Sequence, residues 1–229
     1  RRFVTNSAWL CIAFSLFLTL LVVFLCRPVL QLMNTPAEIF DYAYLYIVII
    51  FWGIPCTLLY NLLAAVIRAL GDSRTPVVFL AVSSVLNIVL DLVSILGLHM
   101  GVEGPALATV IAQGVSGLIC LWYMGRKYPI LKASGEEWRP DGKYMRRLCF
   151  MGIPMGLQYS VTAIGTLVLQ TAINGMGASV VAGVTAAQKI NAFIACPVEA
   201  LGQTMAPYTG QNMGAGKPER IGRGLLQAS

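Results

Sequence analysis

The stretch SVLNIVLDLVSILG, residues 84–97, places a single acidic residue, Asp91, in an otherwise uncharged and mostly apolar run. The nearest lysine or arginine along the chain is Arg74, seventeen positions earlier. A carboxylate inside a membrane costs at least a few kcal/mol, and acids at such positions usually mark the path of an ion or a proton. The role of Asp91 therefore depends on whether residues 84–97 lie in a membrane.

The composition of the chain is that of a membrane protein. Of its 229 residues, 57% are hydrophobic and 11% are charged, and the mean hydropathy is +0.74, whereas soluble domains carry about 25% charged residues. Six runs with few charges each approach or exceed the ~20 residues that a helix needs to cross a bilayer. They cover residues 7–26, 39–67, 76–98, 104–125, 148–174 and 177–207. Because lipid offers no partners to backbone polar groups, these runs predict an all-α polytopic membrane protein with six transmembrane helices.

Lysine and arginine gather on alternate loops, and this predicts an orientation. Cytoplasmic loops collect basic residues. If the chain starts in the cytoplasm, 14 of its 16 basic residues fall on the inner segments 1–6, 68–75, 126–147 and 208–229. The outer loops, around 27–38, 99–103 and 174–178, hold only Arg27. We therefore predict a multi-pass protein of the cell (inner or plasma) membrane with residues 126–147 in the cytoplasm. The net charge of +6 follows from this topology and predicts no nucleic-acid partner.

Residues that support metal binding or catalysis do not cluster in the sequence. The six cysteines are scattered, no CxxC spacing occurs, and His99 is the only histidine. Buried thiols of this kind usually act as small apolar side chains. We expect no cofactor, and we do not expect an enzyme, because no nucleophile, base or metal-ligand cluster is apparent in the spans.

Three of the predicted helices carry polar side chains three or four residues apart, a spacing that places them on one helix face. The three stripes are Ser84, Asn87, Asp91 and Ser94; Thr109, Gln113 and Ser116; and Tyr42, Tyr46, Gly53, Thr57 and Tyr60. Such stripes can converge on a shared polar interior. Alternatively, hydroxyl and amide groups can simply hold membrane helices together. Hydrogen bonding between helices does not explain Asp91, because placing a charged carboxylate inside a membrane costs more than placing a neutral polar group there.

The spacing of Asn87 and Asp91 suits ion chemistry. One helical turn apart, an amide oxygen and a carboxylate can face the same hard cation, such as Na⁺, and a threonine hydroxyl on a neighbouring helix can add a ligand. Alternatively, a carboxyl group in a low-dielectric site can take up and release a proton. Both chemistries use the same residues, and the sequence does not separate them.

The inner loop RALGDSRTPVV, residues 68–78, has the composition of a tight turn between helices. Gly71 suits the position just after a helix, where the backbone turns left-handed. Thr75 is predicted to be the N-cap of the next helix, with Pro76 as its first residue. We predict a structural role for this loop, with gating contacts as the alternative.

The sixth span contains further polar residues that can line a cavity. Gln188 and Glu199 lie close to one helix face, whereas Lys189 is rotated by about 80° from Glu199 at 100° per residue. An ion pair between Lys189 and Glu199 within one helix is therefore not expected. The two charges either reach opposite membrane interfaces or line a water-filled cavity.

Several motifs, in their order and spacing, resemble those of the MATE (multidrug and toxic compound extrusion) transporters. They are RALGDSRTP at 68–76, NIVLD at 87–91, GVEGPALATVIAQ at 101–113 and GQNMGAGKPER at 210–220. The resemblance covers essentially the whole chain. It implies a transporter of twelve helices in two six-helix lobes, of which this chain is an internal fragment holding about helices three to eight.

The resemblance also implies a domain organisation. Residues 1–125 are expected to be the last four helices of the amino-terminal lobe, and residues 126–147 the cytoplasmic linker between lobes. Residues 148–229 are expected to be the first two helices of the carboxy-terminal lobe and the start of the next helix. A monomeric full-length protein is expected.

The DinF-type branch of the family uses a cation site in the amino-terminal lobe. Its asparagine and aspartate on the fifth helix match Asn87 and Asp91, and its threonine on the sixth helix matches Thr109. A further aspartate of that site belongs to the first helix, which lies outside this sequence. Other branches carry an essential acid in the seventh helix, whereas this sequence has no acidic residue between Asp141 and Glu199. The departure favours the DinF-type arrangement, with H⁺ or Na⁺ at Asp91, Asn87 and Thr109.

The function implied by this resemblance is secondary antiport. A cation enters at Asp91, and a small amphipathic or cationic organic compound, such as a drug or toxin, is exported through a central cavity. Residues expected to line that cavity are Tyr46, Gln113, Gln188, Lys189 and Glu199. The alternative is a lipid-linked oligosaccharide flippase of the same superfamily, which would be expected to have a more basic cavity. Lys189 is the only basic residue within a span, which counts against the flippase.

Overall fold

The computed structural model describes residues 1–32, 37–131 and 135–228, and this part of the chain consists of helices joined by turns and loops, with no strand. It divides into two compact units, Arg1–Met145 and Arg146–Ser229, which are described separately. Six helical segments are long and apolar enough to cross a membrane. The all-α fold with six spans is therefore confirmed, whereas the assignment of these spans to two lobes of a longer protein stays a prediction.

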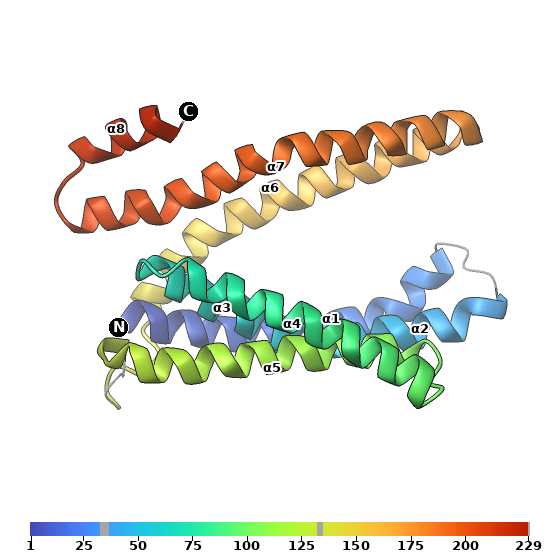
Figure 1. The fold of residues 1–229 in the computed structure, drawn as a ribbon, viewed down its shortest axis with the longest axis horizontal. Coiled ribbons are helices and arrows are strands. Elements are labelled where there is room, and N and C mark those ends of the chain that lie inside the picture. Colours follow the sequence, from blue (N-terminus) through green and yellow to red (C-terminus); the bar gives the residue numbers. More distant parts are fainter. Residues whose placement is uncertain (33–36, 132–134, 229) are drawn as a thin grey trace. The chain divides into compact units, whose positions relative to one another are not determined.

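The first unit contains five α-helices and the start of a sixth (Figure 1). Their bounds are α1 Arg2–Leu32, α2 Ala37–Trp52, α3 Ile54–Ala69, α4 Arg74–Leu92, α5 Glu103–Lys127 and α6 Gly142–Asn174. A short π-helical turn, Val93–Gly97, follows α4, and a 3₁₀ turn, Pro129–Leu131, follows α5.

The second predicted span, 39–67, is made of two helices, α2 and α3, that meet at Gly53. Pro55 lies in the first turn of α3. Because proline has no backbone N–H, it cannot continue the hydrogen-bond ladder of α2, and the first turn of a new helix is the position where this is tolerated. The break therefore divides the span without interrupting its apolar character.

Helix α5 is the centre of the first unit and packs against α2, α3 and α4. One face of α5 carries a small residue every four positions, and all five are buried: Gly104, Ala108, Ala112, Ser116 and Cys120. Small side chains let the backbones of membrane helices approach closely, so that van der Waals contact and interhelical hydrogen bonds can form. The stripe explains why α5 occupies the middle of the bundle.

Glycine marks two close contacts, one between α5 and the α2–α3 junction and one between α5 and α3. A Cβ atom on Gly53 would lie 2.6 Å from the side chain of Val110, and one on Gly117 would lie 3.3 Å from that of Leu59. Below this contact, Tyr60, Leu63, Ala64, Ile67 and Cys120 form a buried apolar cluster. Close glycine contacts and a buried apolar cluster thus hold α3 against α5 at successive positions along the two helices.

The turn between α3 and α4 confirms one prediction and corrects another. Gly71 has a positive φ of 94°, as predicted, and the N–H groups of Gly71 and Asp72 donate to the last carbonyls of α3. However, α4 begins at Arg74, so Thr75 and Pro76 lie inside its first turn and Thr75 is not the N-cap. The Asp72 side chain caps this turn instead, by accepting a hydrogen bond from the Thr75 N–H at 3.1 Å.

The second unit contains most of α6, together with α7 (Ala178–Gly214) and α8 (Glu219–Ala228). None of the residues in the most apolar part of α6 or α7 is buried among the described residues. Helix α7 continues through Pro197 and Pro207 and ends at a tight turn where Gly216 has a φ of 68°. Tyr208 ties this turn to α8 by donating to the Arg220 carbonyl at 3.1 Å.

Candidate ion site

Asp91 lies one residue before the end of α4. Its Oδ1 atom is buried, and no hydrogen bond or ion pair reaches the carboxylate from any residue that the structure describes. Within that part of the chain, Thr19 Oγ1 on α1 is the only other buried side-chain polar atom without a partner. Since a buried, unpaired charge is costly, the Asp91 carboxylate is suited to hold a proton or a cation.

A change in helix geometry follows directly after Asp91. Residues Val93–Gly97 form a π-helical turn, in which the Leu98 N–H donates to the Val93 carbonyl at 2.9 Å. Such turns are rare and frequently occur at functional sites. Ser94, in this turn, donates to the Asp91 carbonyl at 2.9 Å and lies against Gly104 of α5, where a Cβ would come within 2.8 Å of the serine oxygen. Gly104 and Ser94 therefore hold the end of α4 close to the start of α5.

The structure brings Asn87 and Thr109 together across α4 and α5. The Asn87 amide nitrogen donates to Thr109 Oγ1 at 3.4 Å, and the Thr109 hydroxyl donates to the Pro105 carbonyl at 3.0 Å. The Asn87 amide oxygen accepts no hydrogen bond from the described residues. It is therefore available as a ligand, one helical turn from Asp91.

Other members of the predicted polar stripes join helices together. Ser116 donates to the Phe79 carbonyl at 3.4 Å, and Tyr60 donates to the Pro76 carbonyl at 2.9 Å. Ser83, which lies outside the predicted stripes, donates to the Ala112 carbonyl at 2.9 Å. These bonds hold helices together, as in the second arrangement that the sequence left open, whereas a shared polar interior stays a prediction.

The remaining predicted site residues fall on both units. Tyr46 on α2 is 40% exposed, and Gln113 on α5 is half-buried. Gln188, Lys189 and Glu199 lie on α7 and are exposed. That these five residues line one cavity stays a prediction.

A second acidic site, at a position where the sequence predicts a tight turn, lies at the other end of α4. The Asp72 carboxylate accepts hydrogen bonds from the Thr75 N–H and hydroxyl, from the hydroxyls of Tyr123 and Tyr128, and from Lys127 at 2.9 Å. The Asp-x-x-Thr spacing of residues 72–75 could have predicted the two hydrogen bonds between Asp72 and Thr75. The three partners on and just after α5 are about fifty residues away in the sequence and could not be anticipated from it.

The surroundings of Asp72 fix its charge. The hydrogen bond from Lys127, supported by those from Thr75 and Tyr123, holds the pKa of the Asp72 carboxyl well below its usual range. Asp72 is therefore an ionised structural anchor that fastens the α3–α4 turn to the end of α5. It contrasts with Asp91, which has no such partners.

Taken together, six apolar helices and a carboxylate whose Oδ1 atom is buried and has no partner among the described residues define a polytopic membrane protein with a candidate ion site. The MatE family model matches residues 1–93 and 154–228. The chain therefore belongs to the MatE family.

Curated relatives support this membership. The chain is 34% identical over 200 residues to the "Probable multidrug resistance protein YpnP" of Bacillus subtilis, covering 86% of this chain and 44% of the relative. It is 44% identical over 80 residues to the "DNA damage-inducible protein F" of Escherichia coli, covering 33% of this chain and 17% of that protein. The chain thus spans less than half the length of these two relatives.

Solved structures show the same fold. A MOP superfamily transporter from Pyrococcus furiosus matches with a TM-score of 0.89 at 22% identity, over 99% of this chain and 51% of that one. At this level of identity the likeness concerns the fold alone.

Proposed function

We propose that this chain belongs to a secondary antiporter that exports amphipathic or cationic organic compounds in exchange for H⁺ or Na⁺. The observation that carries the proposal is the Asp91 carboxylate, which is buried at Oδ1 and has no partner among the described residues. Beside it, the Asn87–Thr109 pair joins α4 to α5. An inward-moving cation that neutralises Asp91 removes the cost of its charge and lets the polar faces of α4 and α5 repack.

The location of Asp91 suits coupling to an ion gradient. In the structure, Asp91 precedes the end of its membrane-spanning segment, Gly97, by six residues, or about 9 Å at 1.5 Å per residue. A cavity open to one side of the membrane can reach that depth while the rest of the helix stays closed. One charge moved through 100 mV supplies ~2.3 kcal/mol, which supports roughly a fiftyfold concentration ratio of the exported compound.

Drug export is favoured over the flippase alternative by two observations. The first is that curated relatives carry names that refer to multidrug resistance or multidrug export. The second is that Lys189 is the only basic residue in the interior of a span, which gives an anionic lipid-linked oligosaccharide little to bind. We propose that the transporter needs no cofactor besides the coupling ion. We also propose that the full-length transporter acts as a monomer.

The test is export of ethidium, a fluorescent cationic dye, from cells that express the full-length transporter. Dye export should collapse when a protonophore or a sodium ionophore removes the driving gradient, and the ionophore that acts identifies the ion. Export that continues unchanged after both gradients are dissipated, with ATP held constant, would exclude ion-coupled antiport.

A further inference from the structure

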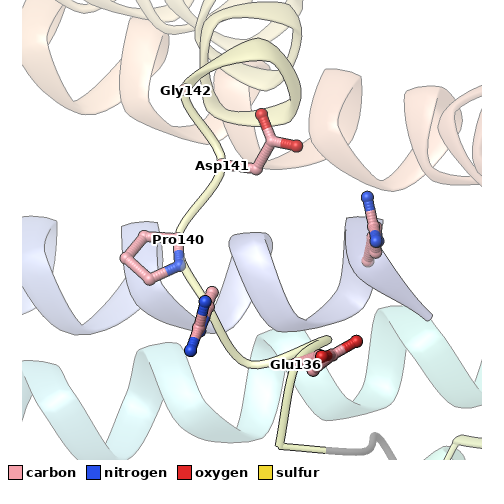
Figure 2. A pocket seen from close by; sticks show the side chains of 6 residues that line it. Glu136, Pro140, Asp141 and Gly142 are labelled. Atoms are coloured by element: carbon pink, nitrogen blue, oxygen red, sulfur yellow. The ribbon is translucent and has the colours of Figure 1, made fainter.

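A polar cavity lies at the end of the first unit, where the loop that follows α5 returns to the beginning of α1. Its volume is about 470 Å³, and its lining residues are Arg2, Glu136, Arg139, Pro140, Asp141 and Gly142 (Figure 2). The cavity is remote in sequence from Asp91 and plays no part in the proposed transport mechanism.

The walls of this cavity are held by hydrogen bonds from the first turns of α1. Asn6 is fully buried, and its side-chain oxygen accepts from the Asp141 N–H at 2.9 Å. The Thr5 hydroxyl donates to the Glu137 carbonyl at 2.7 Å, and the Trp9 indole donates to the Trp138 carbonyl at 2.9 Å. Three side chains of α1 thus fix three backbone groups of the loop, so the cavity has a defined shape.

The cavity carries two charges of each sign. No ion pair joins the side chains of Arg2, Arg139 or Glu136 to another residue in the described part of the chain. Asp141 accepts the Lys143 N–H through Oδ1, which leaves its second oxygen for another partner. Figure 2 shows the Glu136 and Asp141 side chains extending from successive parts of the loop that leads into α6. Guanidinium groups suit phosphate oxygens, whereas carboxylates accept hydrogen bonds from an ammonium group.

Helix length and tryptophan placement indicate that the cavity lies near the level of the lipid headgroups. Helix α1 has 31 residues, or about 46 Å at 1.5 Å per residue, whereas the hydrocarbon core is about 30 Å thick. Its first turn therefore extends beyond the hydrocarbon. Trp9 and Trp138 are both partly exposed, and tryptophan is enriched at the membrane–water interface.

We propose that this cavity binds the headgroup of phosphatidylethanolamine. The phosphate would be held by Arg2 and Arg139, and the primary ammonium group by Glu136 and Asp141. An anionic headgroup such as that of phosphatidylglycerol can bind the two arginines, but it has no positive charge to neutralise the two carboxylates. The headgroup of phosphatidylcholine has no N–H to donate. Only a zwitterion with a primary amine matches all four side chains.

Native mass spectrometry of the full-length protein tests this site by measuring the affinity for added lipids of equal acyl chains. The series is dioleoyl phosphatidylethanolamine, its mono- and dimethylated forms, phosphatidylcholine and phosphatidylglycerol. We expect phosphatidylethanolamine to bind about tenfold more tightly than phosphatidylcholine, since charge-assisted hydrogen bonds are lost on full methylation. Equal affinity for these two lipids, or tighter binding of phosphatidylglycerol, would overturn the proposal.

Three variants localise the effect. Arg139→Gln and Glu136→Gln should each weaken phosphatidylethanolamine binding about tenfold. Lys143→Gln removes a neighbouring exposed charge that does not line the cavity and should leave the affinity within about twofold. If all three variants behave alike, the lipid responds to the general charge of the segment and the site is refuted.

Soluble competitors distinguish a lipid headgroup from a simple anion. Phosphoethanolamine at millimolar concentration should displace the lipid, whereas inorganic phosphate at the same concentration should not. Equal displacement by both would show a phosphate site and contradict the assignment. None of these measurements depends on transport, so their failure leaves the proposed antiport untouched.

Discussion

Asp72 and Asp91 are two carboxylates of one helical bundle with opposite surroundings. Asp72 accepts five hydrogen bonds, whereas Asp91 accepts none at its carboxylate from the described residues. A fully satisfied carboxylate stays ionised and stabilises the fold, whereas an unsatisfied one in an apolar helix needs a proton or cation. Asp72 is therefore a structural anchor, whereas the role of Asp91 in ion coupling is the proposal that the following experiments test.

Replacing Asp72 should destabilise the protein. Asp72→Ala removes the anchor and leaves Thr75, Tyr123 and Lys127 without their shared acceptor, at a cost of roughly 1.5–3 kcal/mol. The thermal unfolding temperature in detergent measures the loss. The matched control is Asp41→Ala, because Asp41 is exposed on α2 and should leave this temperature nearly unchanged. Equal effects of the two variants would refute the anchor.

The low pKa of Asp72 also predicts a pH dependence of stability. Its pKa in the folded protein lies below the unfolded value, which is about 3.9, so its contribution is complete above pH 4 to 5. The contribution is lost as the pH falls from there toward the folded pKa. Unfolding temperatures measured from pH 6 to pH 3 should therefore fall more steeply for the wild type than for Asp72→Asn. Parallel curves would contradict this assignment.

At the scale of the helices, small residues where neighbouring helices touch determine how tightly the bundle packs. Gly53 approaches Val110 so closely that an added Cβ would lie 2.6 Å from its side chain. Gly53→Ala should therefore cost roughly 1–3 kcal/mol through overpacking. Gly125→Ala on α5 is the control, since a Cβ there meets nothing within 4 Å and alanine favours the helix. Thermal unfolding should move in opposite directions for the two variants, and a Gly53→Ala protein as stable as the wild type would contradict the close contact.

The sequence was sufficient to predict the six spans, because each is a long apolar run and lipid forces backbone groups into helices. It also predicted the left-handed residue Gly71. The resemblance to the MATE family placed Asn87 and Thr109 in one site, and the structure joins them by a hydrogen bond. The sequence did not predict the π-helical turn after Asp91, because a single widened turn leaves no clear change in hydrophobic periodicity. The Lys127–Asp72 pair was missed as well, since it depends on how α3, α4 and α5 pack together.

At the scale of the whole molecule, the distribution of basic residues predicts which segments share a side of the membrane. Single cysteines placed at 135–141 and at 99–101, in a background without the six native cysteines, should react with an impermeant reagent from opposite sides. Residues 99–101 should be labelled from outside intact cells and residues 135–141 only in inverted vesicles. Labelling of both segments from one side would refute the six-span topology.

The proposed mechanism predicts graded effects of the neutral residues beside Asp91. Asn87→Ala and Thr109→Ala each remove one uncharged ligand, worth about 1 kcal/mol. Each should therefore raise the ion concentration for half-maximal dye export about fivefold while leaving the maximal rate largely intact. A variant that lowers the maximal rate without changing the ion dependence would place that residue outside the ion site.

The most direct test of the central claim is ion-driven dye export by Asp91→Asn, measured at matched expression in the full-length transporter. The substitution keeps the shape of the side chain and removes its charge. The account predicts a protein that reaches the membrane and binds dye but has lost gradient-driven export, whereas the exposed acid variant Asp41→Asn exports normally. If Asp91→Asn exports dye at the wild-type rate and with the wild-type dependence on the ion gradient, Asp91 is not the coupling carboxylate.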